Sequence, residues 1–198
     1  PLNLNVDENT DSASGFSLGS LATSDPDFPE SFTYAIQGGA DASRFSIGGP
    51  GNDELILTDG MLDFETQSSY SVVVRVTDSA GNTYDETIAV SVNDLNEAPT
   101  AITPSAFNIV EGTNTSSGTS LGLLLATDED VTDSFSYTIQ GGPDASVFSI
   151  GGAGGNELIL TDGTLDYETQ SIYRVIVRVA DSGGNHYDQL IEVTVDDS

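Results

Sequence analysis

The sequence predicts an all-β protein made of two tandem, seven-stranded Greek-key β-sandwiches. The first supporting observation is an internal duplication, because Leu-Asp-Phe-Glu-Thr-Gln at 62–67 recurs as Leu-Asp-Tyr-Glu-Thr-Gln at 165–170, an offset of 165 − 62 = 103. The second is a series of short segments in which apolar residues alternate with polar ones, as in half-buried strands. A period of about 100 residues gives each copy room for its own core. We therefore expect two domains, residues 1–97 and 98–198.

The strands can be placed in chain order within each copy. In the first copy we expect short strands near 2–6, 18–23, 32–37, 45–47 and 54–57, separated by Gly, Asp, Asn and Ser. Two longer alternating segments follow at 70–76 and 88–92, with equivalents at 173–179 and 191–195. A Gly-Asn pair precedes the last segment of each copy, which indicates an antiparallel hairpin. No segment indicates a helix longer than one turn. About seven short strands in 100 residues are typical of a sandwich.

Composition narrows the range of partners. The chain has 32 acidic residues against 4 basic ones, and its formal net charge is −28. Both copies carry this excess, so nucleic acid and anionic membrane surfaces are poor partners. The sequence has no apolar stretch of 18 residues, and we expect no direct membrane insertion. There are no cysteines for disulfides. The charge indicates either bound cations or an adaptation to salt and solubility.

Four acidic groups recur in both copies. Calcium prefers six to eight oxygen ligands, so a site needs several acids that converge from different loops. Strand direction predicts that the Asp-x-Asp group and the strand-ending aspartate lie at the N-terminal end of each sandwich. The Asp-x-Glu group would lie at the opposite end. The groups are an early glutamate (Glu8, Glu111), Asp-x-Asp (Asp25 and Asp27, Asp128 and Asp130), Asp-x-Glu (Asp63 and Glu65, Asp166 and Glu168) and a strand-ending aspartate (Asp78, Asp181).

The order and spacing of these motifs, together with the seam Asp94-Leu95-Asn96-Glu97-Ala98-Pro99, resemble cadherin repeats in the shorter-linker form of large bacterial surface proteins. The resemblance covers the whole chain. It implies a cadherin-like, immunoglobulin-like sandwich fold and calcium ions bound between consecutive repeats. The ligands implied by the resemblance are Glu8, Asp63, Glu65, Asn96 and Glu97 from the first copy and Asp128, Asp130 and Asp181 from the second, with Asp94 nearby.

The linker departs from the family pattern in two ways that leave the number of ions open. It lacks one residue, and Glu97 stands where the family has a second aspartate. The acids at the two outer ends would face neighbouring repeats outside this sequence and should bind calcium weakly. These are Asp25, Asp27 and Asp78 in the first copy and Glu111, Asp166, Glu168 and Asp197 in the second.

Other motifs favour structural roles. Residues 48–56 fit the calcium nonapeptide of β-rolls, but that fold needs several stacked copies, so a glycine-rich hairpin loop is favoured. His186 has no partner histidine or cysteine, which favours a surface position over a transition-metal site. Asp63 and Glu65 fit chelation better than a glycosidase pair, which needs two carboxyl groups across a cleft. We expect no enzymatic activity.

The expected function is that of an extracellular or cell-surface module, part of a larger secreted protein, that binds calcium at the seam between its two domains. The ion would stiffen a rod used in adhesion to another surface protein. Two alternatives stay open at this stage: a calcium-dependent module that binds a polysaccharide, and a passive calcium-stiffened stalk. Retention on an insoluble polysaccharide only in the presence of calcium would favour the first alternative.

Overall fold

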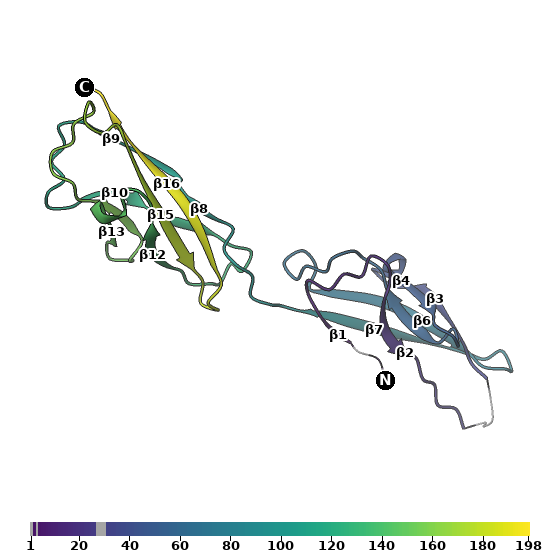
Figure 1. Cartoon of the computed structure of the whole chain (residues 1–198). Helices are drawn as coiled ribbons and strands as arrows, with labels where there is room; N and C mark the ends of the chain where they lie inside the picture. The colour runs from purple at the N-terminus through teal and green to yellow at the C-terminus, as the bar shows by residue number, and fades with distance from the viewer. Residues whose placement is uncertain (1, 3, 27–30) are drawn as a thin grey trace. The chain divides into compact units, whose positions relative to one another are not determined.

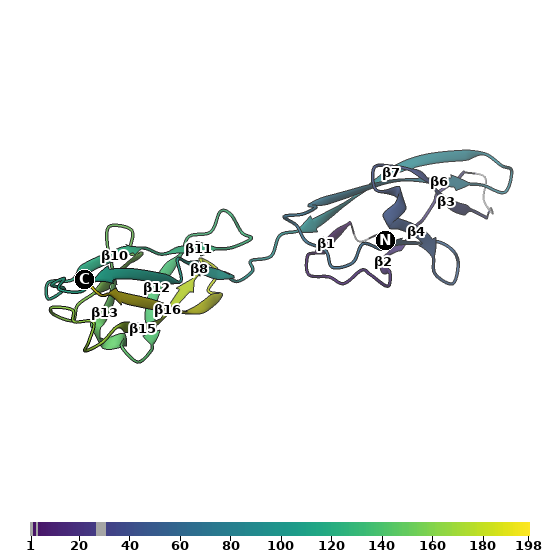
Figure 2. The same cartoon turned by 90° about the horizontal axis from the view of Figure 1, so that it is seen from above.

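A computed structural model describes residues 2, 4–26 and 31–198. The chain divides into two compact units, Pro1–Leu95 and Asn96–Ser198. The sequence placed the boundary two residues later, after Glu97. In the structure Asn96 and Glu97 belong to the second unit. Each unit contains two separate layers of strands (Figure 1), and the same layers are seen from above in Figure 2.

Unit 1 is a sandwich of a four-stranded and a three-stranded sheet. The four-stranded sheet has the order β1(Asn5–Asp7), β7(Thr83–Asn93), β6(Ser69–Thr77), β3(Thr33–Gly38). The three-stranded sheet has the order β2(Phe16–Ser20), β5(Glu54–Leu57), β4(Phe45–Gly48). The seven described strands match the seven expected from the sequence, and β6 and β7 form the predicted antiparallel hairpin.

Unit 2 repeats this arrangement and adds a strand pair. Its larger sheet has the order β12(Ser136–Gly141), β15(Ile172–Ala180), β16(His186–Asp196), β9(Ala106–Val110), and its smaller sheet the order β10(Thr119–Leu123), β14(Glu157–Leu160), β13(Phe148–Gly151). The added pair is β8(Ala101–Thr103) with β11(Leu125–Thr127). Nine strands are therefore described in this unit where the sequence predicted seven, because three-residue strands are too short to show a period.

The two cores are built from the residues that alternate inward along the long strands. Val72 and Val90 are fully buried in unit 1, and Val175 and Val193 are fully buried in unit 2. An aromatic pair recurs in both, since the rings of Phe45 and Tyr70 and those of Phe148 and Tyr173 meet edge to face at 6.4 Å. The duplicated sequence therefore encodes two separate, equivalent cores.

The repeated Gln-Gly-Gly motif marks a tight contact with the neighbouring strand. Gly39 has φ +108°, and a Cβ atom there would lie 2.6 Å from the Cα of Val72. Gly142 repeats this geometry, with φ +111° and 2.9 Å to the Cα of Val175. Only glycine fits this backbone conformation at such a close approach, which explains why both copies retain it.

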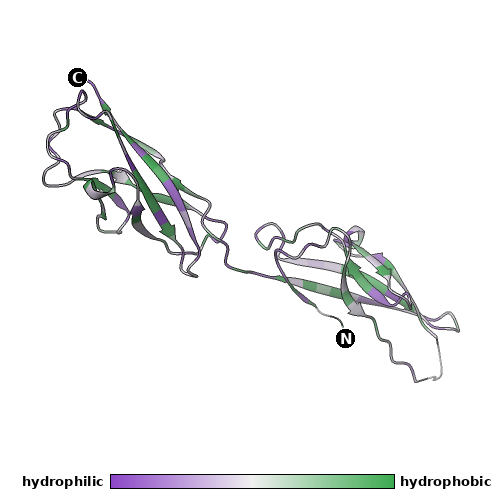
Figure 3. Ribbon diagram, viewed as in Figure 1, coloured by the Kyte–Doolittle hydropathy of each residue, from purple (hydrophilic) through white to green (hydrophobic). Residues whose placement is uncertain are grey.

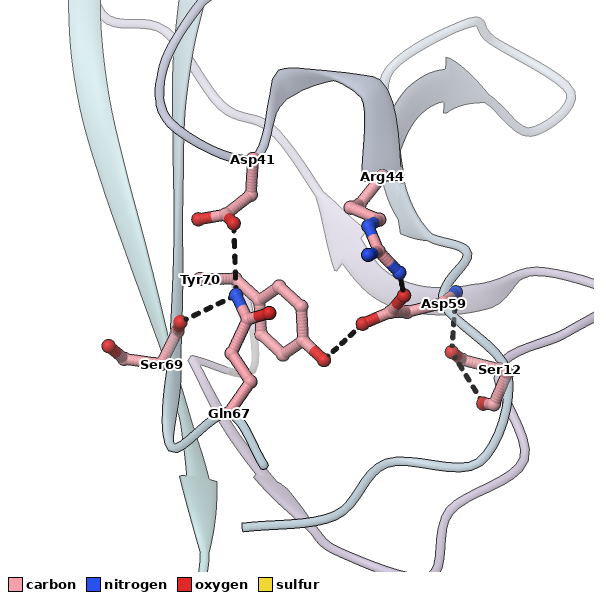
Figure 4. Close-up of polar contacts among 8 residues, drawn as sticks. Ser12, Asp41, Arg44, Asp59, Gln67, Ser69 and Tyr70 are labelled. Atoms are coloured by element: carbon pink, nitrogen blue, oxygen red, sulfur yellow. Dashed lines mark hydrogen bonds and ion pairs between the residues drawn. The ribbon is translucent and has the colours of Figure 1, made fainter. Parts of the chain in front are cut away.

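A polar network secures the loop after β5 in unit 1 (Figure 4). Asp59 accepts a hydrogen bond from the Tyr70 hydroxyl and forms an ion pair with Arg44. Arg44 comes from a single 3-10 turn, Ala42–Arg44. In unit 2 the Tyr173 hydroxyl donates to Asp162 at 2.5 Å, while Val147 occupies the position equivalent to Arg44. Among the described residues, no helix has the length and apolar character needed to span a membrane.

Candidate metal site

The N-terminal end of unit 2 gathers the acids predicted for the seam of the chain. Asp128 follows β11, Asp181 follows β15, and Asn96 and Glu97 lie in the segment before β8. Because β8 pairs antiparallel with β11, with Ala101 opposite Thr127, the incoming chain and Asp128 lie at the same end. We call Asn96, Glu97, Asp128, Asp130, Asp133 and Asp181 the N-terminal acidic set of unit 2.

Hydrogen bonds hold the incoming segment against these loops. The Asn96 side-chain amide donates to Asp181 Oδ2 at 2.8 Å, and the Glu97 backbone N–H donates to Asp130 Oδ2 at 2.9 Å. Asn185 donates from its amide to the carbonyl oxygens of Asn96 and Glu97 at 2.9 and 3.0 Å. The linker residues are thus fixed on the second domain by side chains that the loops supply.

Three aspartates form the centre of this set. Asp128, Asp133 and Asp181 each place one carboxylate oxygen within 4.8 Å of the others. The Oδ2 atoms of Asp128 and Asp133 are buried and have no hydrogen-bond partner. A buried carboxylate oxygen that accepts no hydrogen bond is costly unless a cation or proton compensates it. The donor set is all oxygen, which suits calcium rather than a transition metal.

The pKa values of these carboxyl groups differ because their surroundings differ. Burial raises the pKa of Asp128 above its ordinary value, and the charges of Asp130, Asp133 and Asp181 raise it further. Burial also acts to raise the pKa of Asp181, but hydrogen bonds from Asn96 and from the backbone of Gly184 and Asn185 outweigh it and lower the value. A bound cation would therefore offset both the burial of the Asp128 carboxylate and its repulsion by the neighbouring acids.

Asp133 was missed by sequence reasoning. Its Oδ1 accepts a hydrogen bond from the Ser182 hydroxyl at 2.6 Å, which holds the carboxylate beside Asp181. The sequence does contain a signal, because the residue at the equivalent position of the first copy, 133 − 103 = 30, is Glu30, which is also acidic. Glu30 lies outside the described residues. A search restricted to the Asp-x-Asp motif stops three residues short of this position.

The C-terminal end of unit 1 gathers a second acidic set around Glu8. Glu8 is 4% exposed, and its carboxylate accepts hydrogen bonds from the backbone N–H groups of Phe64 at 2.8 Å and Leu95 at 2.6 Å. These contacts bring Glu8 beside the segment that carries Asp63 and Glu65 and beside the end of β7, where Asp94 lies. The reason for the position of Glu8 is that β1 pairs parallel with β7, with Asp7 opposite Asn93.

The remaining predicted residues of unit 1 differ in exposure. Asp63 accepts hydrogen bonds from the backbone and hydroxyl of Thr66 at 2.9 and 2.8 Å, and the hydroxyl contact is the main cause that lowers the pKa of Asp63. Glu65 and Asp94 are exposed side chains. Both carboxylate oxygens of Asp63 thus already accept a hydrogen bond within a local turn.

Unit 2 repeats this set at its own C-terminal end. One oxygen each from Glu111, Asp166 and Glu168 lies within 4.8 Å of the others. Glu111 accepts from the Tyr167 N–H at 3.3 Å, the counterpart of the Glu8 contact with Phe64. It also accepts from the backbone and hydroxyl of Ser198, which lower the pKa of Glu111. Asp197 is exposed.

At the N-terminal end of unit 1 the contacts of the equivalent residues differ. The Asn82 side-chain amide donates to Asp78 Oδ2 at 2.7 Å, and this contact is the main cause that lowers the pKa of Asp78. In unit 2 the equivalent Asn185 instead holds the linker carbonyl oxygens, and Asn96 takes its place on Asp181. Asp25 lies before β3, and Asp27 lies outside the described residues.

The glycine-rich segment of the first copy and His186 both have structural positions in the fold. Residues 49–53 connect β4 to β5, which pair antiparallel, so the glycine-rich hairpin loop is confirmed. His186 is the exposed first residue of β16.

Comparison with known proteins identifies the family to which this chain belongs. Two tandem β-sandwich repeats, with acidic motifs that recur in both copies, are the features of cadherin repeats. The Cadherin domain family matches residues 3–93 and 107–196, so the chain belongs to the cadherin family. The predicted family and fold class are thereby confirmed.

Relatives and solved structures agree with this assignment. Mouse protocadherin Fat 4 is 31% identical over 185 residues, and rat protocadherin Fat 2 is 38% identical over 133 residues. The aligned regions cover 92% and 63% of this chain but only 4% and 3% of those proteins. A crystal structure of the first two extracellular repeats of human protocadherin-24 matches with a TM-score of 0.71 at 22% identity, covering 98% of this chain and 93% of that one. The chain thus spans only a small fraction of the length of protocadherins Fat 4 and Fat 2.

Proposed function

We propose that this chain is an extracellular calcium-binding cadherin doublet that serves in adhesion or association at a cell surface. The observation that carries the proposal is the pair of buried, unpartnered oxygens on Asp128 and Asp133 beside Asp181. Uncharged neighbouring groups do not compensate the negative charge of these carboxylate oxygens, whereas a divalent cation that prefers oxygen ligands does. The family membership of the chain supports the same ion.

The proposed ligands come from both sides of the Leu95–Asn96 peptide bond. Unit 2 would supply Asp128, Asp130, Asp133, Asp181, Asn96 and Glu97, and unit 1 would supply Glu8, Asp63, Glu65 and Asp94. Bound calcium supplies positive charge that offsets the repulsion among these carboxylates. The residues themselves do the positioning, since Asn96, Asn185 and Ser182 hold the linker and the aspartates in place.

The proposed role follows from this charge balance. Without calcium, carboxylates on the two units repel one another and the linker is free to bend. With calcium, both units share ligands and the linker is restrained, which presents the doublet as a stiff element. The proposal is non-enzymatic. Its partner would be another surface protein, with a polysaccharide as the alternative that binding assays can detect.

Calorimetric titration with calcium tests the proposal. The parent chain should bind with a dissociation constant near the roughly 0.1 to 1 mM of extracellular modules. Asp128→Asn and Asp133→Asn should each weaken binding about tenfold, because each removes a negative ligand at the centre of the set (about 1.4 kcal/mol). Asp25→Asn changes the equivalent residue of the first copy and serves as the matched control. Equal losses in all three variants, or no heat of binding in the parent, would reject the site.

A further inference from the structure

The larger sheet of unit 2 has an outer face that unit 1 does not share. Along β15 and β16 the side chains that point away from the core pair across the strands as Ile176 with Leu190, Arg174 with Glu192 and Arg178 with Asp188. Ile172 continues the row on β15. Ile172 and Leu190 are 38% and 49% exposed. We call these seven residues the unit 2 outer face. Figure 3 shows apolar and polar residues mixed along these strands.

Both charged pairs on this face are closed ion pairs. Arg174 Nε lies 2.7 Å from Glu192 Oε2, and Arg178 donates to both oxygens of Asp188 at 2.7 and 2.8 Å. The Ile176–Leu190 pair lies between these two ion pairs along the strands. The face therefore combines the side chains of Ile172, Ile176 and Leu190, which we call the apolar strip, with charges that cancel.

The first copy provides an internal reference for this face. The offset of 103 places Ser69, Val73 and Thr87 where unit 2 has Ile172, Ile176 and Leu190. Ser71 and Ala89, which pair across β6 and β7, replace the Arg174–Glu192 ion pair. Only the Arg75–Asp85 pair is kept, at 2.6 Å. The two sheets share one backbone register, so folding alone does not require the apolar side chains of unit 2.

The charge of the chain identifies a suitable partner for this face. Two copies with a net charge of −28 each repel one another over most of their surfaces. Two of the four arginines of the chain lie on the unit 2 outer face, where each is balanced by one acid. Alternating positive and negative side chains also allow a two-fold related copy to place its acids opposite these arginines. An equally acidic molecule can therefore approach here with little repulsion.

We propose that the unit 2 outer face is a self-association surface, on which a second copy of this chain packs its own Ile172, Ile176 and Leu190. The contact is isologous, with the Ile176–Leu190 pair at its centre and one ion pair on either side of it along the strands. This inference names a partner for the adhesive role proposed above, but it does not use the calcium ligands. The self-association therefore stands or falls separately from calcium binding.

Sedimentation of the purified chain from about 1 µM to about 1 mM tests the proposal. The average mass should rise with concentration from that of the 20.6 kDa monomer toward twice that value, with calcium and with a chelator. Leu190→Asp should raise the dissociation constant of the dimer at least about tenfold, because it places a charge in the apolar strip. Thr87→Asp makes the same change at the equivalent position of unit 1 and should leave the mass profile unchanged.

A charge exchange makes the test independent of any folding defect. Arg174→Glu alone gives the face a net negative charge and should weaken the dimer, whereas adding Glu192→Arg restores both the ion pair and the association. Circular dichroism should show that all variants fold. A parent chain that stays monomeric throughout, or a dimer weakened equally by Thr87→Asp, would overturn the proposal. Association that requires calcium and survives Leu190→Asp would also overturn it.

Discussion

At the scale of single residues, the carboxylates of unit 2 are not equivalent. Asp181 is surrounded by donors, whereas Asp128 has a buried oxygen with no partner and three acidic neighbours. Both residues can be identified from their sequence motifs, but the motifs do not distinguish their surroundings. Hydrogen bonds from Asn96, Gly184 and Asn185 depend on loop geometry, and motif spacing does not encode it.

Substituting Asp128 should have opposite effects with and without calcium. Because the pKa of Asp128 is raised in the folded state, its ionised form lowers stability as pH rises through that pKa. In chelator at neutral pH, Asp128→Asn should therefore be more stable than the parent by about 0.5 to 1 kcal/mol, the range for charge pairs near a surface. The difference should vanish below the ordinary pKa of about 3.8.

Urea denaturation across this pH range, with and without calcium, measures the effect. In saturating calcium the order should reverse, since the variant has lost a ligand. A variant that is less stable than the parent in chelator at neutral pH would show that Asp128 is not a site of repulsion.

At the scale of elements, the long alternating strands could be predicted from sequence, and their pairing partners could not. The hairpin of β6 and β7 follows from its alternation and turn residues. The parallel pairing of β1 with β7 does not, because alternation reports which side chains are buried but not which strand lies alongside or in which direction. That pairing brings Glu8 to the end of the sandwich where Leu95 leaves it.

The pair of β8 and β11 is the element that joins the linker to the core of unit 2. Ile102 of β8 is 1% exposed, and its N–H donates to the Gln189 side chain at 3.1 Å. Ile102→Ala should lower the free energy of unfolding by about 2 to 5 kcal/mol through lost burial and a cavity. It should also weaken calcium binding, because β8 positions Asn96 and Glu97.

Leu125→Ala is the matched control on the partner strand, since Leu125 is 56% exposed. Its effect on unfolding monitored by circular dichroism should stay within about 0.5 kcal/mol. Similar losses for both variants would mean that β8 contributes no more than a surface strand.

At the scale of the whole molecule, calcium should couple stability to the arrangement of the two domains. A ligand at about 100 times its dissociation constant adds roughly 2.7 kcal/mol to the free energy of unfolding. Thermal melting in calcium should therefore occur at a higher temperature than in chelator. Small-angle scattering should show a narrower distribution of interdomain distances with calcium. Identical melting curves would contradict the calcium assignment, and an unchanged distribution would contradict stiffening.

By itself the sequence determined the duplication, the all-β fold, the cadherin family and most of the acids proposed as ligands. These properties are carried by local periodicity and by motifs that repeat at one offset. Only the tertiary structure decided that Asp133 joins Asp128 and Asp181, that Glu8 lies beside Leu95, and that the outer face of unit 2 combines an apolar strip with closed ion pairs. The physical reason is that each of these depends on contacts between strands and loops far apart in the chain, where pairing and register, rather than spacing, set which groups meet.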